Sequence, residues 1–372
     1  MTRWLRRLIY SLTLAVARLW PRSRVQTYRL TVLKLDNLGD AVLALGAVRV
    51  LLKEYGESET LLVVSSVAEP LFRAEFPRMD LLVLPAFCQR YFPDLIAFLW
   101  RHLVGLRAIS TESLICLRHQ PSDYLHIIAH LIGAKKCYAL RWEKDWENVS
   151  LTFPRVTTAP YPTDPAGQCL ELEAHRSLLS LLLEKQVSIQ SILPVISSAR
   201  PVDGTDLLVC PVAGTPIRHY PPDLLAAAIR SAIGTTPMKI AFCLPPGANT
   251  EPWRRAMDDA GLRETSWHQP TSQSGLLELI AAAGVVLAVE SAPAHLATAM
   301  DKPGVFLLGG GHFGMFAPWQ TSHRQIWLQH AMECYQCRWH CIHPEPYCIT
   351  HIQPKVVAQA LSEVCSRTEP PM

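Results

Sequence analysis

Apolar runs of strand length alternate with stretches of helical spacing along the first half of the chain. The run LTVLKL at 30–35 precedes apolar positions at helical spacing over 41–54, and the runs TLLVVSS and DLLVLPA flank a second helical stretch over 69–76. The run ESLICLRHQ comes next, and a predicted helix over 122–132 follows it. Such short strand–helix–strand spacing predicts an α/β fold with a parallel, doubly wound sheet.

The second half of the chain repeats this alternation. Strands are expected at 207–211, 239–243, 285–289 and 304–308, and helices at 223–232, 251–260, 274–283 and 292–299. Proline and glycine punctuate 193–206, and 141–170 is expected to be irregular. We therefore predict a basic helix over 1–28, a first domain over 29–200, a second over 201–353, and a helix and tail over 354–372.

Composition and charge exclude several classes of protein. The 372 residues are 49% hydrophobic and 18% charged, which is typical of folded globular domains. A net charge of +3 is too small to indicate nucleic-acid binding. The eleven cysteines are spread through apolar segments, which favours reduced thiols in a cytoplasmic protein over a secreted disulfide framework.

The first twenty residues have the pattern of a basic amphipathic helix. Apolar residues recur at helical spacing, and Arg3, Arg7 and Arg18 stand beside them. The apolar run is too short to cross a bilayer. Two interpretations stay open: a helix over 3–20 that lies on the inner surface of a membrane, attracted by anionic lipid, or a helix packed on the domain surface.

The first predicted strand ends in a turn loaded with charge, LKLDNLGDAV at 33–42. Lys34, Asp36 and Asp40 stand there around a single glycine. A carboxylate at the mouth of a cleft can act as a general base. The alternative is a carboxylate that only complements the dipole of the following helix.

Two turns of the second half suit a phosphate group. The first surrounds the start of a predicted helix, whose backbone N–H groups can bind an anion, and it contains Glu290, Ser291, Ala292 and His295. The second follows the next strand, where a backbone without side chains can approach a ligand closely, and it contains Gly309, Gly310, Gly311 and His312. The alternative is a flexible glycine turn beside a core histidine.

A cysteine-rich segment near the end, CYQCRWHCIHPEPYC, contains Cys334, Cys337, Cys341 and Cys348. The first two have the spacing of a metal knuckle, so a structural zinc site with thiolate ligands is one interpretation. Packed thiols and a disulfide are the alternatives, and they are favoured over the metal. We expect no cofactor and no catalytic metal.

Three segments together resemble a known family. LKLDNLGDAVLALGAVRVL, the later ESAPAHLATAM…GVFLLGG…APW, and HIIAHLIGAKKCYAL between them are similar to the heptosyltransferases. These form the ninth sequence family of glycosyltransferases, whose members build the inner core of bacterial lipopolysaccharide. The resemblance implies a GT-B fold, with two Rossmann-like domains facing across a cleft, the acceptor bound by the first and the nucleotide-sugar by the second. It also implies metal-independent, inverting transfer.

The resemblance also assigns roles to residues. It places the catalytic base at Asp40 and a phosphate-orienting lysine at Lys34, and it puts Arg218 where the family often has lysine. The diphosphate would lie among Glu290, Ser291, Ala292 and His295. Two departures leave the donor open: Glu290 replaces an aspartate, and GGGHFGMFAPW replaces the family's GPTDP loop.

The resulting expectation is a cytoplasmic, monomeric glycosyltransferase that lies at the inner face of the membrane. It would move a heptose or related sugar from an ADP-heptose-like donor to a lipid-linked acceptor, such as the lipopolysaccharide core or another surface glycan. Two alternatives stay open. One is a nucleotide-sugar epimerase of the same fold, and the other is a non-catalytic, zinc-stapled nucleotide-sugar-binding protein.

Overall fold

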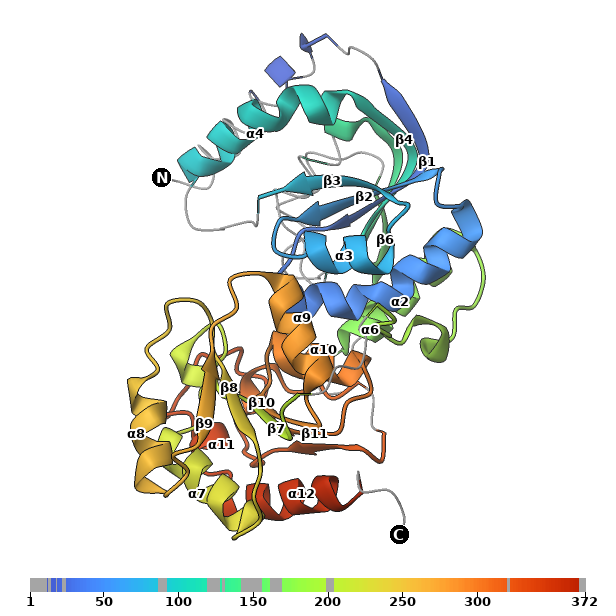
Figure 1. Cartoon of the computed structure of the whole chain (residues 1–372). Helices are drawn as coiled ribbons and strands as arrows, with labels where there is room; N and C mark the ends of the chain where they lie inside the picture. The colour runs from blue at the N-terminus through green and yellow to red at the C-terminus, as the bar shows by residue number, and fades with distance from the viewer. Residues whose placement is uncertain are drawn as a thin grey trace. The chain divides into compact units, whose positions relative to one another are not determined.

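The computed structural model describes residues 12, 15–17, 19–21, 25–85, 92–118, 128, 131–141, 156–160, 169–198, 204–319 and 322–367. By its contacts the chain divides into two compact units (Figure 1). One unit comprises Met1–Asn37 and Ala44–Leu193, and the other comprises Leu38–Leu43 and Pro194–Met372. Each unit contains one six-stranded sheet, and in both sheets the strands pair in parallel.

The first unit has the strand order β3-β2-β1-β4-β5-β6. Its strands are β1 (Gln26–Lys34), β2 (Thr60–Ser65), β3 (Asp80–Leu84), β4 (Ile109–Cys116), β5 (Ala134–Arg141) and β6 (Val156–Pro160). Its described helices are α2 (Leu38–Tyr55), α3 (Glu69–Glu75), α4 (Phe92–Arg107) and α6 (Glu171–Leu183), with a 3-10 turn η2 at Ile189–Ile192. Central β1 is buried without interruption from its middle to its end, as a parallel strand covered on both faces must be.

The second unit has the strand order β12-β11-β10-β7-β8-β9. Its strands are β7 (Leu207–Cys210), β8 (Ile240–Cys243), β9 (Thr265–His268), β10 (Val285–Val289), β11 (Gly304–Leu307) and β12 (Gln325–Leu328). Its helices are α7 (Pro222–Ile233), α8 (Glu251–Asp259), α9 (Gln273–Ala282), α10 (Ala292–Ala299), α11 (Tyr347–Thr350) and α12 (Pro354–Ser366), with 3-10 turns η3 (Pro216–Arg218) and η4 (Gly310–His312).

Both sheets follow the Rossmann order. Counted along each unit, the strands lie in the order 3-2-1-4-5-6, so the direction of winding reverses between β1 and β4 and again between β7 and β10. Sheets of this kind bind ligands beyond the carboxyl ends of the two strands at the reversal. The end of β1 leads to Asp36, and the end of β10 leads to Glu290, so the charged turns noted in the sequence stand at these two points.

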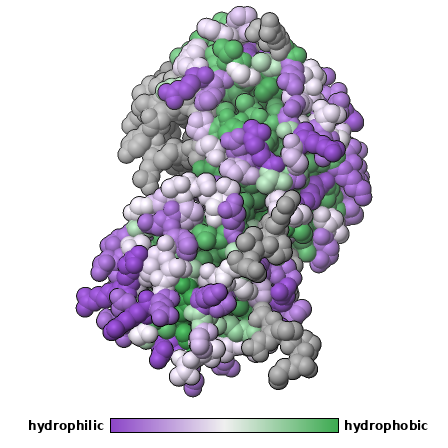
Figure 2. Space-filling view, in the orientation of Figure 1, coloured by the Kyte–Doolittle hydropathy of each residue, from purple (hydrophilic) through white to green (hydrophobic). Residues whose placement is uncertain are grey.

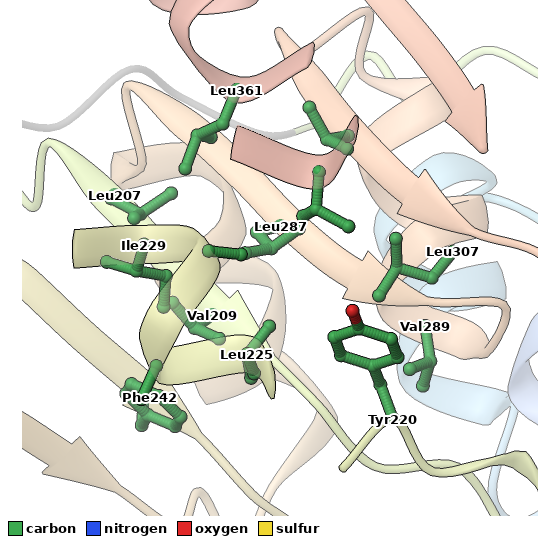
Figure 3. Packing of buried hydrophobic residues seen from close by; sticks show 14 of the residues in the cluster. Leu207, Val209, Tyr220, Leu225, Ile229, Phe242, Leu287, Val289, Leu307 and Leu361 are labelled. Atoms are coloured by element: carbon green, nitrogen blue, oxygen red, sulfur yellow. The ribbon is translucent and has the colours of Figure 1, made fainter. Parts of the chain in front are cut away.

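The core of the second unit is mainly aliphatic and includes the buried aromatic residues Tyr220 and Phe242 (Figure 3). Tyr220 is fully buried, and its hydroxyl donates a hydrogen bond to the carbonyl of Ile352 at 2.6 Å. Helix α12 packs against α7 and contributes Val357 and Leu361 to this core. The segment 354–372, which the sequence sets apart, therefore contains a helix that packs on the second unit. Figure 2 shows apolar residues, in green, among polar ones over the first unit.

The central elements match the sequence predictions, and the peripheral ones were missed. The helices predicted at 41–54, 223–232 and 292–299 form as α2, α7 and α10. Strands β5, β9 and β12 and helix α4 were not predicted, and the expectation of an irregular 141–170 was wrong because β6 lies within it. Most of the helix predicted at 122–132 lies outside the described residues.

Candidate functional site

The loops that follow β7 and β10 bring an arginine and a glutamate together in the second unit. Arg218 ends η3, and its Nη2 donates hydrogen bonds to the backbone carbonyl and to the carboxylate of Glu290. Burial by itself would raise the pKa of Glu290, but the hydrogen bond from His295 and the charge of Arg218 lower it to about 2. Glu290 is therefore ionised near neutral pH and fixes the guanidinium at the carboxyl end of the sheet.

His295 is held on both sides of its ring. The indole Nε1–H of Trp319 donates to Nδ1 at 3.1 Å, and Nε2 lies 3.3 Å from Oε1 of Glu290. Because an indole can only donate, Nδ1 must be the acceptor, which puts the proton on Nε2 and directs it to Glu290. This chain of contacts fixes the ring of His295 beneath the first turn of α10.

The start of α10 offers donors to an anion. Ser291 is extended and its hydroxyl donates to the carbonyl of Val289 at 3.0 Å, so its side chain does not cap the helix. Pro293 follows in the first turn, where its missing N–H costs nothing. The Nε–H of Arg218 is also buried and has no hydrogen-bond partner among the described residues. A buried donor of this kind calls for a polar ligand.

The three glycines after β11 pack closely against aromatic side chains, and a phosphate contact by their backbone stays a prediction. Cβ atoms added at Gly309 and Gly311 would overlap the indole of Trp339, and one at Gly310 would overlap the ring of Tyr335. The backbone N–H groups of Gln336 and Arg338 donate to the carbonyls of Gly310 and Gly311 at 2.7 and 3.0 Å. The groups that approach this backbone closely thus belong to the cysteine-rich segment, and the turn is packed rather than loose.

His312 lies at the end of this glycine turn, between two aromatic rings. Its imidazole meets the rings of Phe316 and Trp339 edge-on, with centroids 5.1 and 5.8 Å away. Burial lowers the pKa of His312 to about 4, since the nearby charge of Glu290 only partly compensates for burial and for the repulsion of Arg218. Near neutral pH the ring is uncharged. It can offer a hydrogen bond to a ligand but adds no positive charge.

The four cysteines of the segment 334–348 line one cavity. Cys334, Cys337, Cys341 and Cys348 surround it together with Tyr335, Trp339 and Tyr347. All four are free thiols, and burial raises the pKa of Cys348. Within the described ranges, no three or more His, Cys, Asp or Glu side chains are arranged to hold a metal ion. The structural zinc site and the packed thiols both stay predictions: Cys348 is buried, whereas Cys334, Cys337 and Cys341 are partly exposed.

A second charged cluster lies in the first unit, where β1 and β4 end. Lys34 Nζ is 2.6 Å from Oε1 of Glu171 and 3.2 Å from Oδ2 of Asp36, and both Lys34 and Glu171 are 1% exposed. Arg118 approaches the other oxygen of Asp36 at 3.1 Å, and Ser65 donates to the Asp36 carbonyl at 2.7 Å. Lys34 is therefore a buried ion-pair partner that helps to fix the turn before α2. A direct phosphate contact by Lys34 stays a prediction.

The proposed base, Asp40, stands in the first turn of α2 and is partly exposed. A carboxylate at this place also complements the helix dipole. Asp36 differs from Asp40 because both of its carboxylate oxygens face cations of the same unit. Asp36 is therefore committed to ion pairs within the first unit, and the role of Asp40 as the base stays a prediction.

Comparison with known families and structures decides the class of this site. A model of glycosyltransferase family 9 (heptosyltransferase) matches residues 128–343, more than half of the chain. The chain belongs to glycosyltransferase family 9. No curated protein sequence matches this glycosyltransferase.

Solved structures of family 9 share its fold. A family 9 glycosyltransferase from Veillonella parvula is 17% identical, with 92% of this chain and 98% of that one covered and a TM-score of 0.68. Escherichia coli heptosyltransferase WaaC, solved with ADP, is 17% identical over 91% and 100% of the chains, with a TM-score of 0.62. Escherichia coli ADP-heptose lipopolysaccharide heptosyltransferase II is 15% identical over 91% and 99%, with a TM-score of 0.61. The family 9 protein therefore has the GT-B fold.

Sequence reasoning missed several residues of this glycosyltransferase. Glu171 and His175 were assigned no role from the sequence, although Glu171 of α6 contacts Lys34 and His175 lies beside Glu171. No local pattern could link Glu171 to a lysine 137 positions away. Trp319 belongs to the APW motif, so a signal existed, but the motif did not reveal that its indole orients His295. Trp339 was hidden among the cysteines.

Proposed function

We propose that this family 9 glycosyltransferase transfers a heptose or a related sugar from a nucleoside-diphosphate sugar, with inversion and without a metal ion. The observation that carries the proposal is the buried cluster of Arg218, Glu290 and His295 at the start of α10. It supplies an arginine N–H without a partner next to uncapped helix N–H groups. This is the chemistry that a diphosphate requires.

In the proposed mechanism the second unit holds the donor. The diphosphate accepts hydrogen bonds from the first turn of α10 and from Nε of Arg218, and these groups stabilise the charge that develops as it leaves. Glu290 keeps the guanidinium of Arg218 in place and accepts a hydrogen bond from Nε2–H of His295. Neither Arg218 nor His295 therefore needs to reorganise during transfer. Because WaaC was solved with ADP, adenosine diphosphate is our proposed leaving group.

Asp40 acts on the acceptor in this proposal. As the acceptor hydroxyl forms its bond to the anomeric carbon, its proton passes to the Asp40 carboxylate and the bond to the diphosphate breaks. One displacement inverts the configuration at the anomeric carbon. Lys34 contributes indirectly, since its ion pairs fix the turn that leads into α2.

We further propose that the acceptor is a lipid-linked surface glycan, such as a lipopolysaccharide core, and that transfer takes place at the cytoplasmic face of the membrane by a monomer. The solved heptosyltransferase II, whose name states a lipopolysaccharide acceptor, supports this choice of class. The sequence differs from the family pattern at Glu290 and in the loop after β11, so the proposal includes donors whose sugar is related to heptose.

Thermal shift tests the donor assignment. A ligand that binds only the folded protein at a hundred times its Kd adds about 2.7 kcal/mol of stability. We expect ADP and ADP-heptose to raise the melting temperature, and uridine and guanosine diphosphate sugars to do so less. The Arg218→Ala variant should lose most of the ADP shift. An equal shift by every nucleotide, or an undiminished ADP shift in the variant, would contradict the assignment.

A further inference from the structure

Exposed apolar side chains gather on one part of the first unit. The described residues include ten large hydrophobic side chains that are exposed, and six of them come from the N-terminal segment and α4. These six, which we call the apolar patch, are Leu12, Val16, Leu19, Trp20, Trp100 and Val104. Isolated exposed apolar residues need no explanation, but a contiguous group marks an interaction site.

Contacts join the two parts of the apolar patch. The rings of Trp20 and Trp100 meet edge-on with centroids 6.5 Å apart, and Arg107 of α4 donates to the carbonyl of Trp20 at 2.8 Å. Ala17 is buried in the same apolar cluster as Leu103 and Leu106 of α4. The described residues of the N-terminal segment accordingly lie beside α4 (Figure 1).

Helical spacing places the apolar patch on the outer faces of both elements. Leu12, Val16 and Leu19 are helical and recur at i, i+4 and i+7, on the side away from buried Ala17. On α4, Trp100 and Val104 are four apart and exposed, while Leu103 and Leu106 point into the unit. Both helices therefore keep one apolar face for their own domain and present a second one outward.

Charge indicates what covers the apolar patch. The first 35 residues contain seven arginines, Arg3, Arg6, Arg7, Arg18, Arg22, Arg24 and Arg29, and no acidic residue before Asp36. Helix α4 adds Arg101 and Arg107 against the single Asp94. In the described part of the chain, Arg101 and Arg107 stand on the same helix as the exposed Trp100 and Val104. Basic charge beside tryptophan and aliphatic side chains matches the anionic surface of a bilayer, where tryptophan prefers the headgroup level. A second copy of the chain would instead bring like charges together.

We propose that α4 and the N-terminal segment form one composite surface that docks onto an anionic lipid bilayer. No helix among the described residues is long and apolar enough to cross a membrane, so this surface would lie on the bilayer. The proposal extends the helix expected over 3–20, because α4 supplies two of the six side chains of the apolar patch. It rests on the proposed function only in that docking brings the enzyme to a lipid-linked acceptor; the binding itself does not depend on transfer.

Vesicle flotation of the full-length protein tests the composite surface. We expect binding to vesicles of phosphatidylglycerol and phosphatidylethanolamine, little binding to pure phosphatidylcholine, and weakening at high salt. The variant Trp100→Ser/Val104→Ser keeps the sequence of the N-terminal segment, although it removes the ring contact with Trp20. It should lower binding about tenfold or more, since it removes apolar area from the contact. Val356→Ser, an equally exposed valine on α12, is the matched control and should bind as the parent does.

The outcomes separate the proposal from its rivals. Undiminished vesicle binding by Trp100→Ser/Val104→Ser would overturn the composite surface and leave the N-terminal helix alone. Equal binding to neutral vesicles would overturn the choice of anionic lipid. A concentration-dependent dimer that the variant abolishes, without vesicle binding, would assign the apolar patch to self-association. ADP binding, measured by thermal shift in the same variant, should be unchanged, so failure here is distinct from failure of the donor assignment.

Discussion

At the scale of residues, each unit holds a buried glutamate between a cation and a histidine. Glu171 pairs with Lys34 and lies 3.3 Å from His175, and Glu290 pairs with Arg218 and lies 3.3 Å from His295. Each cluster contains a buried nitrogen without a hydrogen-bond partner among the described residues: Nδ1 of His175 in the first and Nε of Arg218 in the second. The second cluster differs in its place, because it lies at the start of α10, whose N–H groups no side chain caps.

Asp40→Asn tests the base. The amide keeps the shape of the carboxylate but cannot take a proton, and loss of a general base lowers the rate by roughly 10²–10⁴. We expect the turnover of donor with acceptor to fall by that factor, with ADP affinity within a few-fold of the parent. Asp36→Asn serves as the comparison. Near-normal turnover of Asp40→Asn would rule out the base assignment.

Lys34→Met tests the buried ion pairs of the first unit. Removal of one partner leaves Glu171 buried and uncompensated, which costs about 3–5 kcal/mol. Urea unfolding should show this loss, and the double variant Lys34→Met/Glu171→Leu should recover a large part of it. If the double variant were no more stable than the single one, the ion pair would not explain the loss.

His312 predicts a loss of stability in mild acid. Its folded pKa of about 4 lies below the ordinary value of 6.5, so between these values the unfolded chain binds a proton that the folded chain does not. The contribution of neutral His312 to the free energy of unfolding is fully present above pH 6.5 and declines as the pH falls towards 4. The total decline amounts to no more than about 3 kcal/mol.

The control for this pH effect is His312→Gln, which should flatten the decline in urea-derived stability between these two pH values. Glu290, whose pKa of about 2 lies below its ordinary 4.5, adds its own decline in stability below pH 4.5, so the two slopes are compared between pH 4.5 and 6.5. An identical slope in the variant and the parent would show that other groups cause the decline.

At the scale of elements, the glycine turn η4 and the cysteine-rich segment form one packed unit. Tyr335, whose ring covers Gly310, is itself anchored by a hydrogen bond from its hydroxyl to the carbonyl of His330 at 2.5 Å. Residues Gln336, Arg338 and Trp339 have positive φ angles of 71°, 50° and 63°, a conformation that costs non-glycine residues about 1–2 kcal/mol each. The packing of the rings on the glycines compensates for this strain.

Gly310→Ala tests this packing. The new methyl group would overlap the anchored ring of Tyr335, and overpacking of this kind typically costs about 1–3 kcal/mol. Gly214→Ala is the matched control, because no other atom lies within 4 Å of its added Cβ. We expect a lower melting temperature for Gly310→Ala alone. Equal melting temperatures for the two variants would show that the segment can shift to make room.

The sequence predicts elements well where burial imposes a period. Strands β1, β7 and β10 are central and buried on both faces, so their apolar runs are unbroken. Strand β9 lies at a sheet edge with the sequence TSWH, which is short, polar and only partly buried, and no pattern distinguishes it from a loop. The same holds for the candidate site: a turn motif indicated Glu290 and the family resemblance indicated Arg218, whereas the contacts of Glu171 and Trp319 depend on the tertiary structure.

At the scale of the whole molecule, two series of alternating strands and helices predict two sheets, and the structure contains two of the same strand order. The resemblance in a few motifs leads to the correct family and fold. Sequence motifs do not predict which face of α4 is exposed, because exposure depends on how the unit folds. The apolar patch therefore follows from the packing of the N-terminal segment beside α4.

The ion pair between Lys34 and Glu171 also constrains the order of events on the ribosome. Lys34 ends the central strand of the first sheet, and its buried carboxylate partner is synthesised 137 residues later. Until that glutamate leaves the exit tunnel, the lysine at the end of the central strand lacks one of its carboxylate partners, and contacts between such distant positions form late. We therefore expect the core of the first unit to close only after α6 has been synthesised.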